Sequence, residues 1–158
     1  MEYDHINHTE LTQRFKSGAN WFYWIAGLTI ITSLIAFFGG GIRFLISLGL
    51  TQIIDGFAQG LATELGSAVQ VIGLILDLIV TAVFVLFGYL AGKKMLAMYM
   101  VGMVVFLLDG LLALAFQDWI SVIAHAVVLF WLFRGYQAGR ELVSLEKVMA
   151  EQQPEPAI

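Results

Sequence analysis

Four long apolar stretches constrain the fold of this chain more than any other feature. They run from Trp21 to Phe38, from Ala68 to Ala91, from Met95 to Phe116 and from Trp119 to Tyr136. About 20 helical residues cross a hydrocarbon core about 30 Å thick, so these stretches match membrane spans in length. They predict an all-α, polytopic helical membrane protein with four transmembrane helices, over about 21–38, 68–91, 95–116 and 119–136.

The composition supports this class and excludes others. Hydrophobic residues make up 59% of the 158 residues and charged residues 13%, against about 45–50% and about 25% in soluble domains. A soluble fold of this size has no interior for such an excess, so the expected partner is a lipid bilayer. The net charge of −4 comes without a basic patch for nucleic acid. The absence of cysteine excludes disulfides and thiolate metal sites.

The first apolar stretch is interpreted as a span and not as a cleaved signal peptide. It opens on the aromatic run from Trp21 to Trp24 instead of a basic segment, and its apolar core is longer than a usual signal sequence. Residues 1–20 then form a cytoplasmic amphipathic segment, residues 21–140 a single membrane domain, and residues 141–158 a cytoplasmic helix and tail.

The basic residues predict the orientation. With four spans, all but Arg43 fall on one side of the membrane: Arg14, Lys16, Lys93, Lys94, Arg134, Arg140 and Lys147. Short cytoplasmic loops carry the excess of Lys and Arg. Both termini are therefore expected in the cytoplasm, with the protein in a plasma membrane, of the bacterial inner-membrane type.

The segment 42–61 decides between four spans and five. Its polar residues Arg43, Ser47, Thr51, Asp55 and Gln59 recur at a spacing of four, which indicates one amphipathic helix with a narrow polar stripe. We expect an outer-face helix that is interfacial or re-entrant, because five spans would move Arg14 and Lys16 outside. A fifth transmembrane helix remains the alternative.

A possible internal sequence repeat favours the alternative of a fifth transmembrane helix. Residues 88–93 and 135–140 share the pattern Gly-Tyr-x-Ala-Gly-basic, and Asp55-Gly56 resembles Asp109-Gly110 in its apolar setting. A duplicated hairpin would make 42–61 the counterpart of a true span, but the two matches have different offsets. The pairs Gly88/Gly92 and Gly135/Gly139 permit close helix approach, within the bundle or between protomers.

Ionisable residues at hydrocarbon depth form the candidate site. Asp77, Asp109 and His125 lie about 13, 10 and 9 Å below the outer ends of their stretches at about 1.5 Å per residue. Three helices thus present polar groups in one layer, with Asp55 above it as a gate. The helical repeat adds Gln70 and Thr81 to the face of Asp77, and Ser121 to that of His125.

Two interpretations of this layer stay open. In the first, it is a proton relay, an ion site or a metal site, since carboxylate and imidazole are ordinary metal ligands. In the second, the residues hydrogen-bond between helices and only hold the bundle together. No spacing such as His-Glu-x-x-His is present to identify a metalloenzyme, so no cofactor is assigned and a metal is left undecided.

From the sequence alone we predict a small accessory or scaffold protein that acts through helix–helix contacts, without catalysis of its own. Its partners would be a second copy of the chain or a larger membrane complex. The alternative is a transporter, channel or proton-coupled subunit that uses the layer of Asp and His residues. An intramembrane enzyme comes third.

Overall fold

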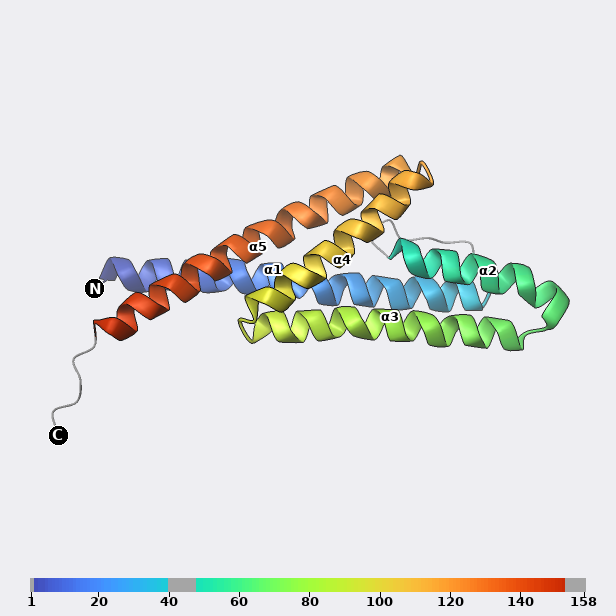
Figure 1. Cartoon of the computed structure of the whole chain (residues 1–158), viewed down its shortest axis with the longest axis horizontal. Helices are drawn as coiled ribbons and strands as arrows, with labels where there is room; N and C mark the ends of the chain where they lie inside the picture. The colour runs from blue at the N-terminus through green and yellow to red at the C-terminus, as the bar shows by residue number, and fades with distance from the viewer. Residues whose placement is uncertain (1, 40–47, 153–158) are drawn as a thin grey trace, which may run out of the picture.

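The computed structural model describes residues 2–39 and 48–152, and side chains from His8 onward within those ranges. Five helices follow one another: α1 (Glu2–Phe37), α2 (Gly49–Leu65), α3 (Ala68–Gly92), α4 (Leu96–Ala115) and α5 (Trp119–Glu151) (Figure 1). Within the described residues, α1, α3, α4 and α5 are long and apolar enough to cross a membrane. This confirms the predicted all-α fold with four spans and one additional helix.

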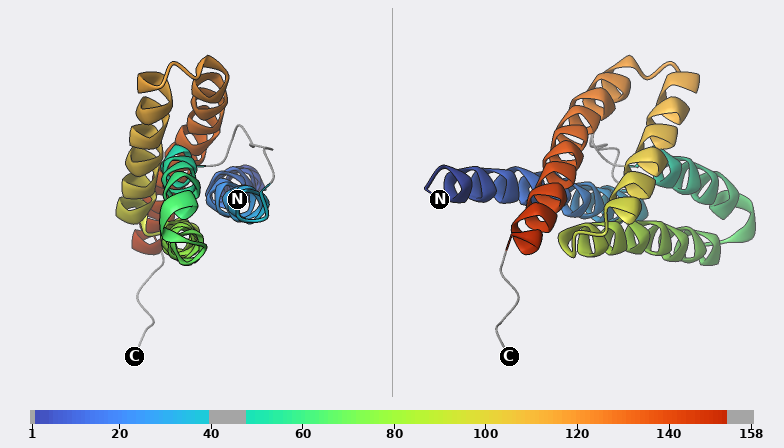
Figure 2. Two further views of the ribbon diagram at one scale, coloured as in Figure 1. Left: turned by 90° about the vertical axis from the view of Figure 1, so that its right-hand side faces the viewer. Right: turned by 60° about the vertical axis from the view of Figure 1, so that its left-hand side comes forward.

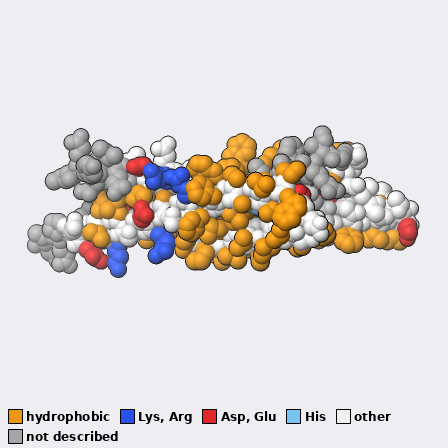
Figure 3. All heavy atoms as spheres, turned by 90° about the horizontal axis from the view of Figure 1, so that it is seen from above, with side chains coloured by type: hydrophobic (Ala, Val, Ile, Leu, Met, Phe, Trp, Pro, Cys, Tyr) orange, Lys and Arg blue, Asp and Glu red, His pale blue; other side chains and the backbone are white. Residues whose placement is uncertain are grey.

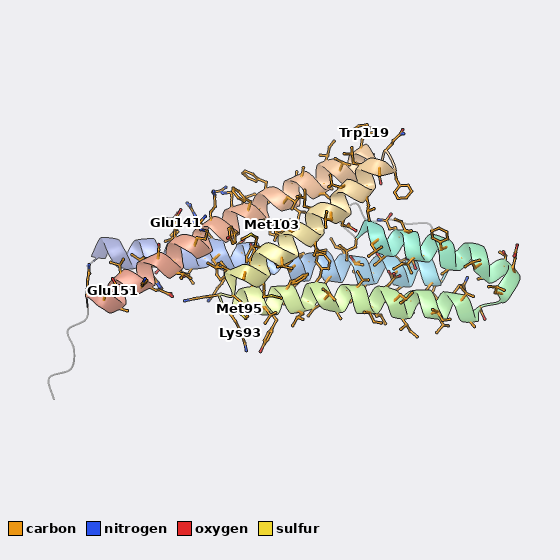
Figure 4. The ribbon with its side chains drawn as sticks, in the orientation of Figure 1. Lys93, Met95, Met103, Trp119, Glu141 and Glu151 are labelled. Carbon is orange, nitrogen blue, oxygen red and sulfur yellow. The ribbon has the colours of Figure 1, made fainter. Side chains whose placement is uncertain are left out.

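The helices form two groups that cross each other. α3 lies along α1 and α2, while the hairpin of α4 and α5 is inclined across α1 and α3 (Figures 1 and 2). Lys93 and Glu151 lie toward one end of the molecule and Trp119 toward the other (Figure 4). We call the first the terminal end, because α1 begins and α5 ends there. The second, with the α2–α3 and α4–α5 links, is the hairpin end.

An aromatic core joins α1, α3 and α4. The ring of Phe22 contacts the rings of Phe84, Phe87 and Tyr99 at centroid distances of 6.5, 6.2 and 5.3 Å, and Phe84 contacts Phe106 at 6.3 Å. Aromatic pairs at these distances contribute beyond their buried area. The buried hydroxyl of Tyr99 donates a hydrogen bond to the carbonyl of Leu132, which connects the core to α5.

Glycines set the close approach of α1 to α5. A Cβ on Gly18 would lie 2.6 Å from the Cα of Gly135, so at this crossing the two backbones touch. Gly139 faces the ring of Phe15, and Gly88 faces the ring of Tyr23 on α1. Gly92 has no atom within contact distance of its Cβ position in the described part of the chain. Three of the four glycines singled out in the sequence therefore lie at helix contacts within one chain.

Charged side chains gather at the terminal end. Glu146 of α5 accepts hydrogen bonds from Lys94, in the α3–α4 link, and from His8 of α1. Figure 3 shows Lys and Arg near this end and hydrophobic side chains over the middle of the visible face. This is the distribution that a bilayer-embedded bundle requires, with charge at the ends and apolar side chains against lipid.

Helix α2 lies alongside the spans and not flat across their ends. The amide of Leu48, just before it, donates to the hydroxyl of Thr29 on α1, two turns before α1 ends at Phe37. Further along α2, Gln59 donates to the carbonyl of Ala36 and Ala58 packs against Gly73 of α3. The helix predicted over 42–61 is observed as Gly49–Leu65, and residues 42–47 of the prediction lie outside the described residues.

Candidate functional site

Asp109 of α4 caps the start of α2. Its two carboxylate oxygens accept hydrogen bonds from the amides of Gly49 and Leu50, at 2.8 and 2.9 Å. The first amides of a helix have no partner within the helix, and Leu48 at the N-cap position offers no side-chain acceptor. A carboxylate is also favoured at the positive end of the helix dipole. A residue 60 positions away in the sequence therefore provides the cap that α2 lacks.

His125 of α5 completes this arrangement. Its Nε2 lies 3.0 Å from Asp109 Oδ2 and its Nδ1 lies 2.7 Å from the carbonyl oxygen of Ser121. The ring also stacks on Phe106 at 4.6 Å. His125 and Asp109 are 2% and 6% exposed, so the pair is withdrawn from solvent. We call Asp109, His125 and the first two amides of α2 the cap cluster.

The cap cluster leaves His125 no free nitrogen. A carbonyl oxygen only accepts, so Nδ1 donates to Ser121, while Nε2 is directed at a carboxylate that already receives two amide hydrogens. The hydroxyl of Ser121 donates to Asp118 and not to the imidazole. His125 therefore has neither a lone pair nor a hydroxyl partner available for general-base chemistry, although it borders a cavity of about 380 Å³ beside Gln52 and Asp118. Both ring nitrogens of His125 are thus engaged within the bundle.

Asp77 of α3 lies in a second cluster. Its carboxyl group lies close enough to the carboxyl of Asp55 on α2 and to the hydroxyl of Ser33 on α1 to interact with both, but outside the geometry of a hydrogen bond. Asp77 and Ser33 are 1% and 2% exposed. Neither oxygen of Asp77, nor the hydroxyls of Ser33 and Thr81, has a hydrogen-bond partner among the described residues. We call Asp55, Asp77, Ser33 and Thr81 the acid cluster.

The structure thus divides the predicted polar layer into two clusters. Asp109 and His125 belong to the cap cluster with Ser121 beside them, whereas Asp77 pairs with Asp55. Helix α2 connects the two, because its first amides meet Asp109 and Asp55 follows five residues later, about 8 Å along the axis. Gln70 is partly buried about 10 Å from Asp77 along α3, two turns nearer the hairpin end.

The acid cluster offers only oxygen atoms. Within the described residues, no group of three or more His, Cys, Asp or Glu side chains could hold a metal ion. Carboxylate and hydroxyl oxygens suit a proton or a hard cation such as Na⁺, and not a soft transition metal. Two carboxylates this close repel each other in a poorly solvated interior, and a proton or cation between them removes that repulsion.

Two buried hydroxyls were not predicted from the sequence: that of Ser33, which belongs to the acid cluster, and that of Thr29, which lies beside the start of α2. Ser33 and Thr29 were visible only as polar interruptions of the first span, without a sign that they faced α2 and α3. Both are buried. Thr29 donates to the carbonyl of Ile25 and accepts from Leu48. Three apolar-span interruptions within five residues, Thr29, Thr32 and Ser33, were the available signal.

Comparison with known proteins finds no match, since no family model, no curated protein and no solved structure resembles this chain.

Proposed function

We propose that this chain is a multi-pass membrane protein that binds and transfers protons at the Asp55–Asp77 carboxyl pair. One observation carries the proposal: the carboxyl of Asp77 is 1% exposed and interacts with a second carboxyl, that of Asp55, while neither oxygen of Asp77 has a partner in hydrogen-bond geometry within the described part of the chain. A buried polar group without a partner costs free energy, and acids at membrane depth mark ion or proton pathways. A residue that only joined helices would be hydrogen-bonded, as Asp109 is.

The surroundings of the pair give it access from one side. Asp55 is partly exposed, so it can exchange a proton with water at the hairpin end and pass it to Asp77. Toward the terminal end, the same face of α3 continues from Thr81 to the buried rings of Phe84 and Phe87. These rings close the path, so transfer across the whole membrane requires the helices to rearrange.

We also propose a location and an orientation for the protein. The basic side chains of the terminal end support cytoplasmic termini in a bacterial plasma membrane, because short cytoplasmic loops carry the positive charge. The acid cluster would then open toward the outside. Protons would enter from the compartment that an energised membrane makes acidic.

A scaffold that acts through helix contacts is the second candidate. A distinct observation favours it: α2 presents Phe57 and Leu65, which are 69% and 68% exposed, beside Gly56 and Gly60. Neither glycine has an atom within contact distance of its Cβ position in the described part of the chain. Small residues allow close packing of membrane helices, so this face suits a second copy of the chain or another subunit of a complex.

Proton flux in proteoliposomes separates the two candidates. With a pH gradient and a pH-sensitive dye inside the vesicles, the wild-type protein should acidify the lumen faster than empty vesicles do. Asp77→Asn and Asp55→Asn remove the titrating group with little change in shape, so their flux should fall to the level of empty vesicles. Glu64→Gln is the matched control, since Glu64 is an exposed acid of the same helix α2.

Flux should depend on pH and not on added Na⁺. If the flux required Na⁺, the ion bound at the carboxyl pair would be Na⁺ and not a proton. A wild-type rate equal to that of empty vesicles, or an Asp77→Asn variant as active as the wild type, would contradict the proposal and leave the scaffold.

A further inference from the structure

A groove between α1 and α5 carries two arginines at the terminal end. It has a volume of about 310 Å³, and its lining includes Gln13, Arg14 and Ser17 of α1 and Trp131 and Arg134 of α5. The contact of Gly18 with Gly135 forms its base, because the two backbones touch there. Neither the cap cluster nor the acid cluster borders this groove.

Arg134 is the unusual residue of the groove. It forms no ion pair within the described part of the chain, and its guanidinium lies over the rings of Phe130 and Trp131 at 5.8 and 5.6 Å. Arg14 pairs with Glu10, which also lines the groove. Glu10, Arg14 and Arg134 together carry one net positive charge. The planar guanidinium of Arg134 presents its N–H groups in a geometry that matches phosphate oxygens.

The groove lies at the depth of lipid head groups. On α1 it ends at Gly18, just before the apolar stretch begins at Trp21. On α5, Arg134 follows Trp119 by 15 residues, about 22 Å along the helix, which places it toward the inner boundary of the hydrocarbon core. Trp131 and Phe130 are 43% and 56% exposed, so an apolar surface continues from the groove toward the bilayer centre.

We infer that this groove binds an anionic phospholipid, with its phosphate between Arg134 and Arg14 and an acyl chain along Phe130 and Trp131. Basic pockets between transmembrane helices on the cytoplasmic side bind lipid head groups in this way. A free phosphate would use the arginines and Ser17 alone, whereas the exposed aromatic rings beside Arg134 favour a ligand with an apolar part.

Lipid retention tests the inference. The protein is reconstituted in nanodiscs with equal amounts of phosphatidylglycerol and phosphatidylcholine, and the lipids that stay bound on release are counted by native mass spectrometry. The wild type should retain phosphatidylglycerol preferentially. Arg134→Gln should reduce that preference about fivefold, which is the contribution of one basic residue near an anionic surface. Arg140→Gln is the control, because Arg140 lies on the same helix outside the groove.

Three results would overturn the inference. The first is no preference for phosphatidylglycerol in the wild type, and the second is equal retention by the Arg134→Gln and Arg140→Gln variants. The third is displacement of the lipid by inorganic phosphate, which would indicate a site for a free anion. Melting temperatures in detergent show whether Arg134→Gln is folded, and if it is not, Arg14→Gln is judged against Arg140→Gln by the same criterion.

Discussion

At the scale of single residues, two buried aspartates in neighbouring helices have opposite environments. Asp109 accepts hydrogen bonds from two backbone amides and pairs with the His125 ring. Asp77 accepts no hydrogen bond from the described residues. The first arrangement stabilises a carboxylate by charge-assisted hydrogen bonds, and the second leaves a carboxyl group available to exchange a proton. We therefore propose a structural role for the aspartate of the cap cluster and a functional role for that of the acid cluster.

Asparagine substitutions should separate these roles. Asp109→Asn replaces one acceptor oxygen by an NH₂ group that faces donors, so we expect it to destabilise the protein by about 1–3 kcal/mol, the cost of an unsatisfied buried group. Asp77→Asn breaks no hydrogen bond among the described residues and should change stability by much less. Unfolding in mixed detergent micelles measures both.

Glu64→Gln serves again as the control for an exposed acid. If Asp77→Asn were as destabilising as Asp109→Asn, Asp77 would be a structural residue and the acid cluster would lose its distinction from the cap cluster.

At the scale of helices, the contact of α1 with α5 depends on two glycines that have no room for a side chain. A Cβ on Gly135 would lie 2.7 Å from the Cα of Gly18 and 2.5 Å from the hydroxyl of Tyr99. In lipid, helices associate through close packing and not through a hydrophobic drive between them. Close backbone packing at this crossing therefore fixes α1 against α5. The same packing forms the base of the groove that Arg14 and Arg134 line.

Alanine at Gly135 should therefore separate the helices. We expect Gly135→Ala to lower the free energy of unfolding by about 1–3 kcal/mol, as overpacking typically does. Gly92→Ala is the matched control, because its Cβ would meet no described atom and alanine favours a helix over glycine. Equal melting temperatures for the two variants would mean that α1 and α5 do not cross at Gly18 and Gly135.

At the scale of the whole molecule, the part of the chain that the structure describes has four membrane-length helices, an even number. The start of α1 and the end of α5 lie at the terminal end, and the α2–α3 and α4–α5 links lie at the hairpin end (Figure 1). We expect α2 to add no crossing, because it begins at the level of Thr29 and ends at the hairpin end. With four crossings, we expect both termini on one side of the membrane.

Single cysteines can test this topology cleanly, because the chain has no native cysteine. In intact cells, a membrane-impermeant maleimide should label Gln117→Cys in the α4–α5 link and should not label Thr9→Cys or Gln152→Cys. After the cells are opened, all three should react. Labelling of Thr9→Cys in intact cells, with Gln152→Cys protected, would show five crossings and make α2 a span.

The sequence by itself determined the class of fold, the four spans and the amphipathic character of α2. These depend on local properties, because the length of an apolar stretch and the period of its polar residues can be read without knowing any contact. It also identified Asp77, Asp109 and His125 as ionisable residues at hydrocarbon depth, with Asp55 above them.

Only the tertiary structure decided which of these residues meet. Depth estimates placed Asp77, Asp109 and His125 in one layer, but depth along each helix says nothing about which face of one helix turns toward another. That pairing depends on helix rotation and crossing, which the contacts of Gly18 with Gly135 and of Ala58 with Gly73 set across long sequence separations. Because α2 returns between the spans, Asp109 meets its amides and Asp55 meets Asp77, and no local pattern encodes that return.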